Sequence, residues 1–241
     1  MTTNVLDMQS LMMTTDSRWS AEVGDLIFYL DNTGCDKISV RGNNEYAFIF
    51  AGDGLVIQSW KDWIASNQKG SAGMPAKKND PLIAMCIVNL KNFKIEHEHG
   101  QSITHPVAKF AGTGAVPANF CWIENKDAKQ AVESAKKYDV FSGGDVTFFE
   151  FKTLNNNLKN TITIREVNRR LSIGEGTVVN KNNFQATPIL DAAAKDDNVR
   201  NVMAQLADGT VTASAPCDAM YGTWDDEDIE TLTSVFDRIF C

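Results

Sequence analysis

The sequence predicts an α+β fold whose sheets and helices stack in layers, as in a four-layer sandwich. The expected elements run strands, one helix, strands, two helices and a strand, and this order lacks the strict βαβα alternation of a doubly wound sheet. The chain has 241 residues, of which 43% are hydrophobic and 22% charged, so it suits one large domain or one domain with an extension.

Short strands open the chain. Residues 2–8 and 10–18 are predicted to be two strands joined by a tight turn near residues 7–9. Two further strands are expected at residues 25–31 and 37–42. A stronger candidate lies at residues 45–52, an aromatic and β-branched run that ends at a glycine.

A helix is predicted next, at residues 55–66, because Leu55, Trp60, Trp63 and Ile64 recur at helical spacing. A loop rich in Gly, Ser, Pro and Lys follows it. The sequence then favours three strands, the second of which is expected to pair with the first, at residues 81–90, 92–99 and 107–114.

Two helices are expected at residues 115–124 and 126–138, before a Gly-Gly break and a strand at 146–151. Residues 1–151 form the predicted core, and residues 152–241 the remainder of the same domain plus an extension to which no role is assigned. Three elements are expected there: a strand at 160–167, a helix at 188–207 capped by Thr187, and a helix that begins at the acidic run 225–228.

The bulk properties exclude two classes of partner. A formal net charge of −8 leaves no basic face for nucleic acid or for an anionic membrane. No apolar run reaches the roughly 18 residues of a membrane span, and the N-terminus lacks the pattern of a secretory signal. Scattered cysteines without CxxC spacing indicate reduced thiols in a cytoplasmic protein: Cys35, Cys86, Cys121, Cys217 and Cys241.

The histidines offer a candidate metal site. His97 and His99 project from one face of a predicted strand, and His105 follows nearby. A solvent-facing strand end is the favoured interpretation, because no carboxylate or cysteine partner has fitting spacing. We therefore expect neither a metal nor a cofactor.

Short motifs far apart in the chain stand in an informative order. They are Met-Thr-Thr at 1–3, Thr-Thr-Asp-Ser-Arg at 14–18, Lys37, Phe-Ala-Gly-Asp-Gly at 50–54, Ala-Gly-Thr-Gly-Ala at 111–115, and Asp-x-x-Ser-Gly-Gly at 139–144. This order resembles the proteasome β-subunit family of N-terminal nucleophile (Ntn) hydrolases, especially its bacterial and phage-borne peptidases. The resemblance covers residues 1–151 and implies an αββα sandwich, with two antiparallel sheets between helical layers and a C-terminal extension.

The resemblance implies that Thr2 is the nucleophile, exposed when an aminopeptidase removes Met1. A threonine hydroxyl needs an adjacent base, and in the family this base is the threonine's own α-amine, whose pKa of about 7.7–8 suits proton transfer at neutral pH. Asp16 and Lys37 match the ion pair beneath the hydroxyl, where an ammonium lowers the pKa of the hydroxyl.

The remaining roles also follow from the resemblance. Asp139 and Ser142 match the pair that hydrogen-bonds the terminal amine, and the Gly52 N–H matches the oxyanion donor. Substrate-binding positions are Phe50, which shapes the primary specificity pocket, and Ser17 with Arg18. Each motif alone also fits a structural role, such as an Asp16–Arg18 ion pair at a strand end, a solvated Lys37 or a simple turn at the two glycines.

The implied activity is that of a threonine-type peptidase or amidohydrolase that works as a homo-oligomer, without a cofactor. Whether an ATP-driven unfoldase delivers substrate to it is left open by this sequence. Two alternatives stay open: a catalytically inactive Ntn-fold binding or immunity-type protein, and an enzyme that cleaves a small-molecule amide rather than a peptide.

Overall fold

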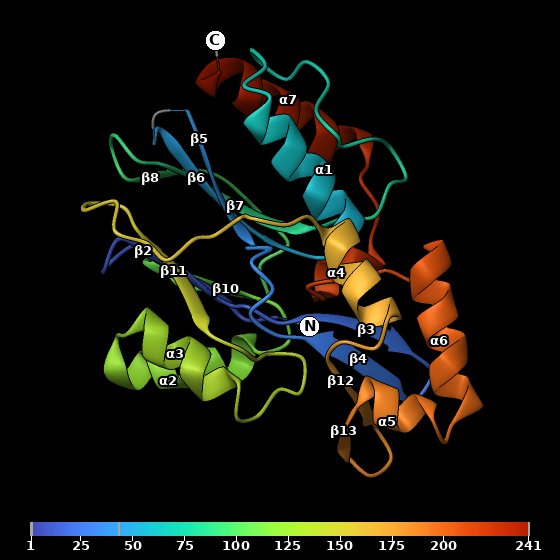
Figure 1. Cartoon of the computed structure of the whole chain (residues 1–241). Helices are drawn as coiled ribbons and strands as arrows, with labels where there is room; N and C mark the ends of the chain where they lie inside the picture. The colour runs from blue at the N-terminus through green and yellow to red at the C-terminus, as the bar shows by residue number, and fades with distance from the viewer. Residues whose placement is uncertain (1, 43, 241) are drawn as a thin grey trace.

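The computed structural model describes residues 2–42 and 44–240, so the N-terminal Met1 and the C-terminal Cys241 lie outside the described residues. Within them, the strands form three antiparallel sheets, in the orders β11-β2-β1-β10-β9, β13-β12-β4-β3 and β5-β6-β7-β8. Seven α-helices accompany the sheets in the described part of the chain. The predicted α+β class is confirmed (Figure 1).

The first sheet is built on the N-terminal hairpin. Strand β1 (Asn4–Asp7) pairs with β2 (Met12–Asp16), and the Asp7 carboxylate accepts hydrogen bonds from the two backbone amides of the turn. The predicted hairpin is thus confirmed. Strand β10 (Ala108–Ala111) flanks β1 and β11 (Val146–Glu150) flanks β2, with the short β9 (Ile103–Thr104) at the edge.

Two helices cover one face of this sheet (Figure 1). They are α2 (Ala115–Asn125) and α3 (Ala128–Ala135), at the positions where helices are predicted. Small and aromatic side chains join them to the strands, as Val5 and Phe110 pack with Trp122 and Val132. This packing holds the motif at 111–115 against the start of the chain.

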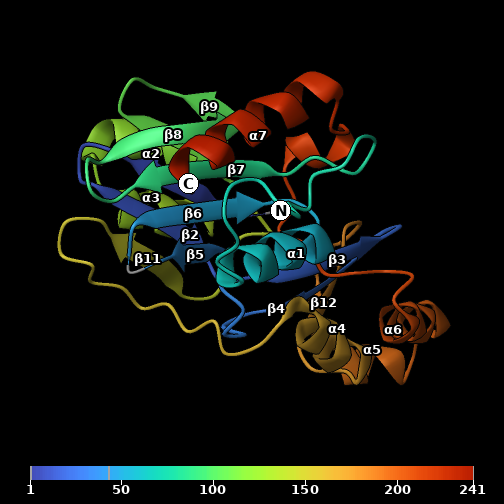
Figure 2. The ribbon, with the colours of Figure 1, turned by 90° about the horizontal axis from the view of Figure 1, so that it is seen from above.

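The third sheet packs on the other face of the first. Its strands are β5 (Ile38–Arg41), β6 (Tyr46–Ala51), β7 (Ala84–Asn89) and β8 (Lys94–His99). Alternate residues of β6 pack in two different hydrophobic clusters. Ala47 and Ile49 lie in the cluster between the first and third sheets, with Leu6 and Phe149. Phe48 and Phe50 lie on the opposite side of the third sheet. On that side lie α1 (Gly54–Ala65) and α7 (Asp226–Ile239) (Figure 2).

The second sheet lies beside this stack. The sequence resemblance implies two sheets, so this additional sheet is not expected from it. It contains β3 (Trp19–Val23), β4 (Leu26–Leu30), β12 (Thr177–Asn180) and β13 (Ala186–Pro188). Helices α4 (Ile164–Ser172), α5 (Ile189–Ala193) and α6 (Asp197–Asp208) accompany it. Residues beyond 151 therefore build a sheet jointly with the N-terminal third of the chain.

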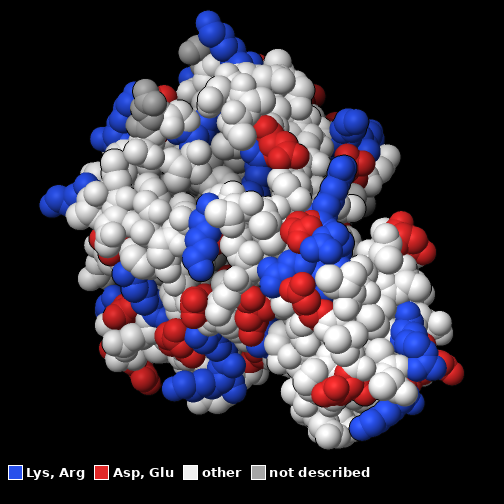
Figure 3. Space-filling view, in the orientation of Figure 1, with Lys and Arg blue, Asp and Glu red and all other residues white. Residues whose placement is uncertain are grey.

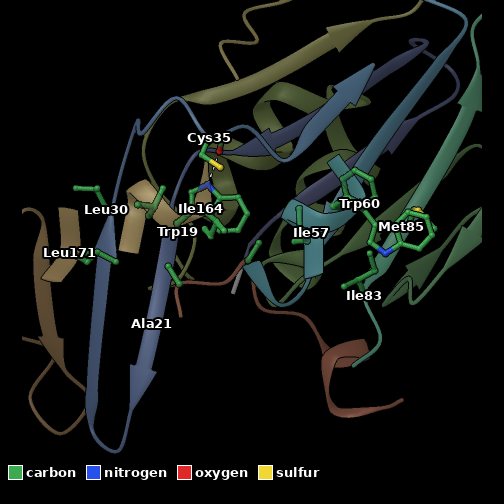
Figure 4. Packing of buried hydrophobic residues seen from close by; sticks show 14 of the residues in the cluster. Trp19, Ala21, Leu30, Cys35, Ile57, Trp60, Ile83, Met85, Ile164 and Leu171 are labelled. Carbon is green, nitrogen blue, oxygen red and sulfur yellow. Dashed lines mark hydrogen bonds between the residues drawn. The ribbon is translucent and has the colours of Figure 1, made fainter. Parts of the chain in front are cut away.

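One large core joins the second and third sheets (Figure 4). Trp19 and Trp60 are both fully buried in it, and the Trp19 indole donates a 2.6 Å hydrogen bond to the Cys35 carbonyl. Ile164 and Leu171 of α4 belong to the same cluster. The segment that precedes Lys37 is thus fixed by packing on both sides.

Two predictions for the C-terminal part are wrong. Residues 160–167 do not form a strand: they lead into α4, whose buried Ile164, Val167 and Leu171 recur at helical spacing. The helix predicted at 188–207 is two helices, α5 and α6, and its first cap is Pro188 instead of Thr187. The break falls where the Asp196 side chain accepts a hydrogen bond from the Asn198 N–H and caps α6.

The last helix agrees with its prediction. Helix α7 starts in the acidic run, where the Asp225 side chain caps it, and it buries Leu232 and Phe236. None of the helices in residues 2–42 and 44–240 is both long enough and apolar enough to cross a membrane.

Candidate active site

Three side chains from the two stacked sheets meet in the interior. Thr2 precedes β1, Asp16 ends β2, and Lys37 lies directly before β5. The Lys37 Nζ lies 2.6 Å from the Thr2 Oγ1 and 3.0 Å from the Asp16 Oδ1. The Thr2 hydroxyl also donates to the Asp16 Oδ1. All three residues are at most 1% exposed, so water does not screen these contacts.

The ammonium of Lys37 is in an unusual electrostatic environment. Burial lowers the pKa of Lys37 below its usual value, while the Asp16 carboxylate opposes that shift. The same ammonium donates a 2.9 Å hydrogen bond to the Asp16 carbonyl and lies 5.7 Å from the centre of the Trp19 ring. The alternative interpretation of the sequence, in which Lys37 is exposed to solvent, is therefore wrong.

The Asp16 carboxylate is oriented by backbone amides. Its Oδ1 accepts from the Thr3 N–H at 2.9 Å, and its Oδ2 accepts from the N–H groups of Arg18 and Gly143, each at 3.1 Å. A carboxylate with this many donors keeps one orientation, and it presents its charge to Lys37. The Asp-x-x-Ser-Gly-Gly motif thus contacts the N-terminal hairpin directly.

A second hydrogen-bonded group approaches from that motif. The Ser142 hydroxyl donates to the Asp139 Oδ2 at 2.6 Å and lies 2.7 Å from the Thr3 Oγ1. Thr113 also donates to the Asp139 Oδ2, at 3.0 Å. The Asp139–Ser142 pair therefore contacts the side chain of Thr3, which is the residue after the expected nucleophile Thr2.

Thr3 and Thr113 are polar residues of the site that the motif comparison did not single out. Both stand inside motifs that it quoted, at the third position of Met-Thr-Thr and the centre of Ala-Gly-Thr-Gly-Ala. The hydroxyl of each threonine inside a quoted motif was the available signal, but the partners of these hydroxyls are visible only in three dimensions.

Glycines make room for the N-terminus. A Cβ atom on Gly112 would lie 1.9 Å from the Thr2 carbonyl oxygen, and one on Gly114 would lie 1.8 Å from the Thr3 Oγ1. Gly112 also has φ +89°, which a side chain disfavours. The glycines of the 111–115 motif are thus required for close approach of the chain start.

The Gly52 N–H, the expected oxyanion donor, has a partner from the C-terminal part of the chain. It donates a 2.5 Å hydrogen bond to the Ala215 carbonyl, and the Ala215 N–H donates to the Gly52 carbonyl at 2.9 Å. Gly52 has φ +140°, and a Cβ there would lie 2.7 Å from Ile83. Nothing in the sequence motifs predicts this pairing.

The three expected substrate-binding residues differ in their surroundings. Phe50 is fully buried, with its ring stacked on Phe48 at 6.1 Å. Ser17 donates to the Asn32 side chain at 2.6 Å. Arg18 forms its ion pair with Asp31 at 2.8 Å, so the Asp16–Arg18 ion pair considered from the sequence is not the one formed.

A cavity of about 590 Å³ opens beside the site. Arg18, Asp139, Ser142, Gly143 and Phe184 are among the residues that line it. It connects the Asp139–Ser142 pair with solvent, and Ser142 is the residue that links this cavity to the buried threonines.

The histidines do not gather into one site. His97 and His99 stack at 6.4 Å, and His99 stacks on Trp224 at 5.0 Å, whereas the His105 Nε2 bonds the Asn119 side chain at 2.6 Å. Across residues 2–42 and 44–240, no group of three metal-binding side chains occurs.

Comparisons with known proteins give structural similarities only. No protein-family model and no curated protein matches the chain. Among solved structures, Thiobacillus denitrificans BPH in complex with epoxomicin is similar at 13% identity and TM-score 0.42, over 61% of this chain and 96% of that one. A second structure of Thiobacillus denitrificans BPH is similar at 14% identity and TM-score 0.41, over 62% of this chain and 96% of that one. Eukaryotic HslV from Trypanosoma brucei is similar at 12% identity and TM-score 0.37, over 61% and 97%.

Proposed function

We propose that the chain is a proteasome-like Ntn hydrolase, a threonine-type peptidase or amidohydrolase whose nucleophile is Thr2. The observation that carries this proposal is the buried Lys37 ammonium, 2.6 Å from the Thr2 hydroxyl and paired with Asp16. In the proposed αββα sandwich, the first and third sheets are the inner layers, with α2 and α3 outside one and α1 and α7 outside the other.

The buried Lys37–Asp16 ion pair beside the Thr2 hydroxyl is better explained by nucleophilic catalysis than by a contribution to the stability of the fold. A buried ion pair is often no more stabilising than apolar side chains of the same volume, so a buried Lys–Asp pair against a hydroxyl indicates a chemical role. A fixed positive charge next to a hydroxyl lowers its pKa and makes it a better nucleophile.

The proposed reaction begins once Met1 is removed. The freed α-amine of Thr2 takes the proton from Oγ1 as the oxygen attacks the amide carbon, and the Gly52 N–H stabilises the negative oxygen of the tetrahedral intermediate. The protonated amine then gives its proton to the leaving nitrogen, and an ester on Thr2 remains. Water, deprotonated by the same amine, hydrolyses that ester and releases the acid.

The other residues have positioning roles in this proposal. Asp139 and Ser142 hold the first residues of the chain through Thr3 and bond the terminal amine. Arg18 fixes the loop that carries Gly143, since its guanidinium bonds both Asp31 and the Val140 carbonyl. We assign Phe50 to the wall of the pocket for the side chain at the cleavage position, and Ser17 to the rim of the groove.

The proposed partners are a peptide or another amide and further copies of the chain, in the cytoplasm. On the face in Figure 3, acidic and basic side chains are interspersed, which does not favour nucleic acid. Self-association is supported by the exposed apolar side chains of α2 and its neighbour Tyr138, which is 77% exposed. We assign no unfoldase partner.

One observation favours the second candidate, a catalytically inactive binding protein with the same scaffold. The Gly52 N–H is already bonded to Ala215, so the expected oxyanion donor is occupied. The two candidates differ in whether Thr2 reacts.

Amide hydrolysis tests the proposal. Untagged protein is incubated with a set of fluorogenic tripeptide amides and with simple aryl amides, beside the Thr2→Ala and Thr2→Ser variants. We expect release of the fluorophore by wild type and by Thr2→Ser, and none by Thr2→Ala, because alanine has no hydroxyl. Equal hydrolysis by wild type and Thr2→Ala would contradict the proposal, and the preferred amide class would separate peptides from small molecules.

A further inference from the structure

A short extended segment from the C-terminal part of the chain crosses the candidate site. It lies between α6 and the 3₁₀ turn η1 (Asp218–Tyr221). Ser214 exchanges both backbone hydrogen bonds with Ser20, at 2.8 and 3.1 Å, and Ala215 exchanges both with Gly52, at 2.9 and 2.5 Å. Both pairings are antiparallel.

The segment has the geometry of a strand bound between two edges. In an antiparallel sheet, successive residues of a central strand direct their N–H and C=O groups to opposite neighbours. Ser214 and Ala215 do so, with β3 of the second sheet on one side and the end of β6 in the third sheet on the other. Any extended peptide placed there would find the same four backbone partners.

We propose that residues 213–215 act as a built-in plug, an internal peptide that fills the substrate groove and must leave before a substrate peptide binds. This inference rests on the proposed function, since it takes Gly52 as the oxyanion donor. The Ala215 carbonyl then stands where the carbonyl to be attacked would lie. The plug slows the resting protein, so wild type reacts only in the fraction of molecules whose groove is open.

Side-chain contacts hold the plug in place. The Asn168 Oδ1 accepts from the Ala213 N–H at 2.8 Å, and the Asn168 Nδ2 donates to the Thr212 Oγ1 at 2.9 Å. Ala213 and Ala215 are fully buried. A Cβ atom on Gly54 would lie 2.0 Å from the Ala213 carbonyl oxygen, so this glycine admits the segment.

The residue after Ala215 explains why the plug persists. Pro216 disfavours helical geometry at Ala215 and so favours the extended form that the groove accepts. The bond between them is a tertiary amide, and both of its ends stay tethered, by α6 on one side and η1 on the other. An amine that leaves Ala215 would remain next to the new ester and re-form the amide, because tethering gives it a high effective concentration.

The plug can be loosened or locked by substitution. Asn168→Ala removes the two anchoring hydrogen bonds, and Ser214→Pro removes the N–H that bonds Ser20. A pair of changes, Ser20→Cys with Ser214→Cys, allows a disulfide, because residues in a hydrogen-bonded antiparallel pair lie about 5.5 Å apart at Cα, within the range that a disulfide spans. Asn201→Ala, on the exposed side of α6, is the matched control.

The measurement is the rate at which a peptide epoxyketone adds to each protein, followed by intact mass. This reagent forms a ring with a hydroxyl and a free amine on one residue: the hydroxyl adds to the ketone, the amine opens the epoxide, and the whole reagent mass is retained. We expect Asn168→Ala and Ser214→Pro to react at least about tenfold faster than wild type and Asn201→Ala. The oxidised double-cysteine protein should not react, and reduction should restore its reaction.

The experiment gives different results if the plug proposal is wrong and if the proposed function is wrong. Equal rates in wild type, both loosened variants and the oxidised lock, all with adduct on Thr2, would overturn the plug and leave the proposed function intact. No adduct in any protein whose mass shows the loss of Met1 would overturn the proposed function and the plug with it. Circular dichroism on both loosened variants identifies one that fails to fold, and the lock tests the plug without loosening anything.

Discussion

Lys37 holds its ammonium in a fully buried position between a carboxylate and a hydroxyl. The type and order of Thr2, Asp16 and Lys37 are predictable from the sequence, because they stand in motifs with a recognisable order. Their burial is not, since it depends on two sheets that pack face to face. The contact between Thr3 and Ser142 could not be predicted from the motifs, because these residues lie at opposite ends of the predicted core in sequence.

Replacement of Lys37 should separate chemistry from packing. We expect Lys37→Met to slow epoxyketone addition at least about a hundredfold, because the hydroxyl loses the charge that lowers its pKa. It should also lower the free energy of unfolding by about 3–5 kcal/mol, since Asp16 is left buried without its partner. The double variant Lys37→Met with Asp16→Asn should recover much of that stability in urea unfolding, yet remain slow to react. Recovery of the reaction as well would contradict the role of Lys37.

His97 should make the protein sensitive to acid. Burial lowers the pKa of His97 from 6.5 to about 4, and the nearby His99 adds to the shift. The unfolded chain therefore binds the proton more readily, so stability is fully present above pH 6.5 and falls as the pH drops toward 4, by at most about 3 kcal/mol.

Urea unfolding between pH 7 and pH 4 checks this expectation. His97→Gln should flatten the loss of stability across that range, because glutamine has no group that takes up a proton there. An unchanged pH dependence in His97→Gln would show that other groups cause the acid sensitivity.

At the scale of elements, glycines allow the strand-to-helix turn at 111–115 to contact the start of the N-terminal hairpin. Most elements up to residue 151 could be predicted, because they have a clear local period, but β3 (Trp19–Val23) and the two-residue β9 were missed. The segment at 160–167 could not, since its short alternation competes with a helical period set by Ile164, Val167 and Leu171. The pairing of Ser214 and Ala215 lies outside any local pattern, because its partners are in the first quarter of the chain.

Gly112→Ala tests how closely these elements must approach. Its Cβ would overlap the Thr2 carbonyl oxygen, so we expect a loss of at least about 2 kcal/mol in the free energy of unfolding and slower epoxyketone addition. Gly24→Ala is the matched control, with φ +57° but no atom within 4 Å of the new Cβ, and should cost only about 1 kcal/mol. Equal losses in the two variants would show that backbone strain, and not contact with Thr2, explains the glycine.

At the scale of the whole molecule, an apolar surface on α2 is left uncovered. Val116, Phe120 and Ile123 are 53%, 66% and 45% exposed, and the first two line a cavity of about 530 Å³ with Tyr138. Apolar side chains gathered on one helix face favour association with another surface. The three-sheet arrangement was not predictable, because β12 pairs with β4, far away in the sequence, and β13 extends the sheet from β12.

Phe120→Ser should weaken self-association. We expect wild type to sediment as an oligomer in analytical ultracentrifugation and Phe120→Ser to shift toward the monomer, since the largest apolar side chain of this surface is removed. Tyr221→Ser, which changes an 80% exposed aromatic residue elsewhere, should sediment like wild type. A monomeric wild type would contradict the proposed assembly.

The most direct test of the central claim, that Thr2 is an N-terminal nucleophile, is an intact mass of the untagged protein before and after a peptide epoxyketone. We predict that wild type and Asn168→Ala lack Met1 and that at least the loosened variant gains one reagent mass on Thr2, while the double variant Asn168→Ala with Thr2→Ala gains none. A chain that retains Met1 and takes up no reagent even with the plug loosened would contradict the claim, and the inactive binding protein would then be the better description.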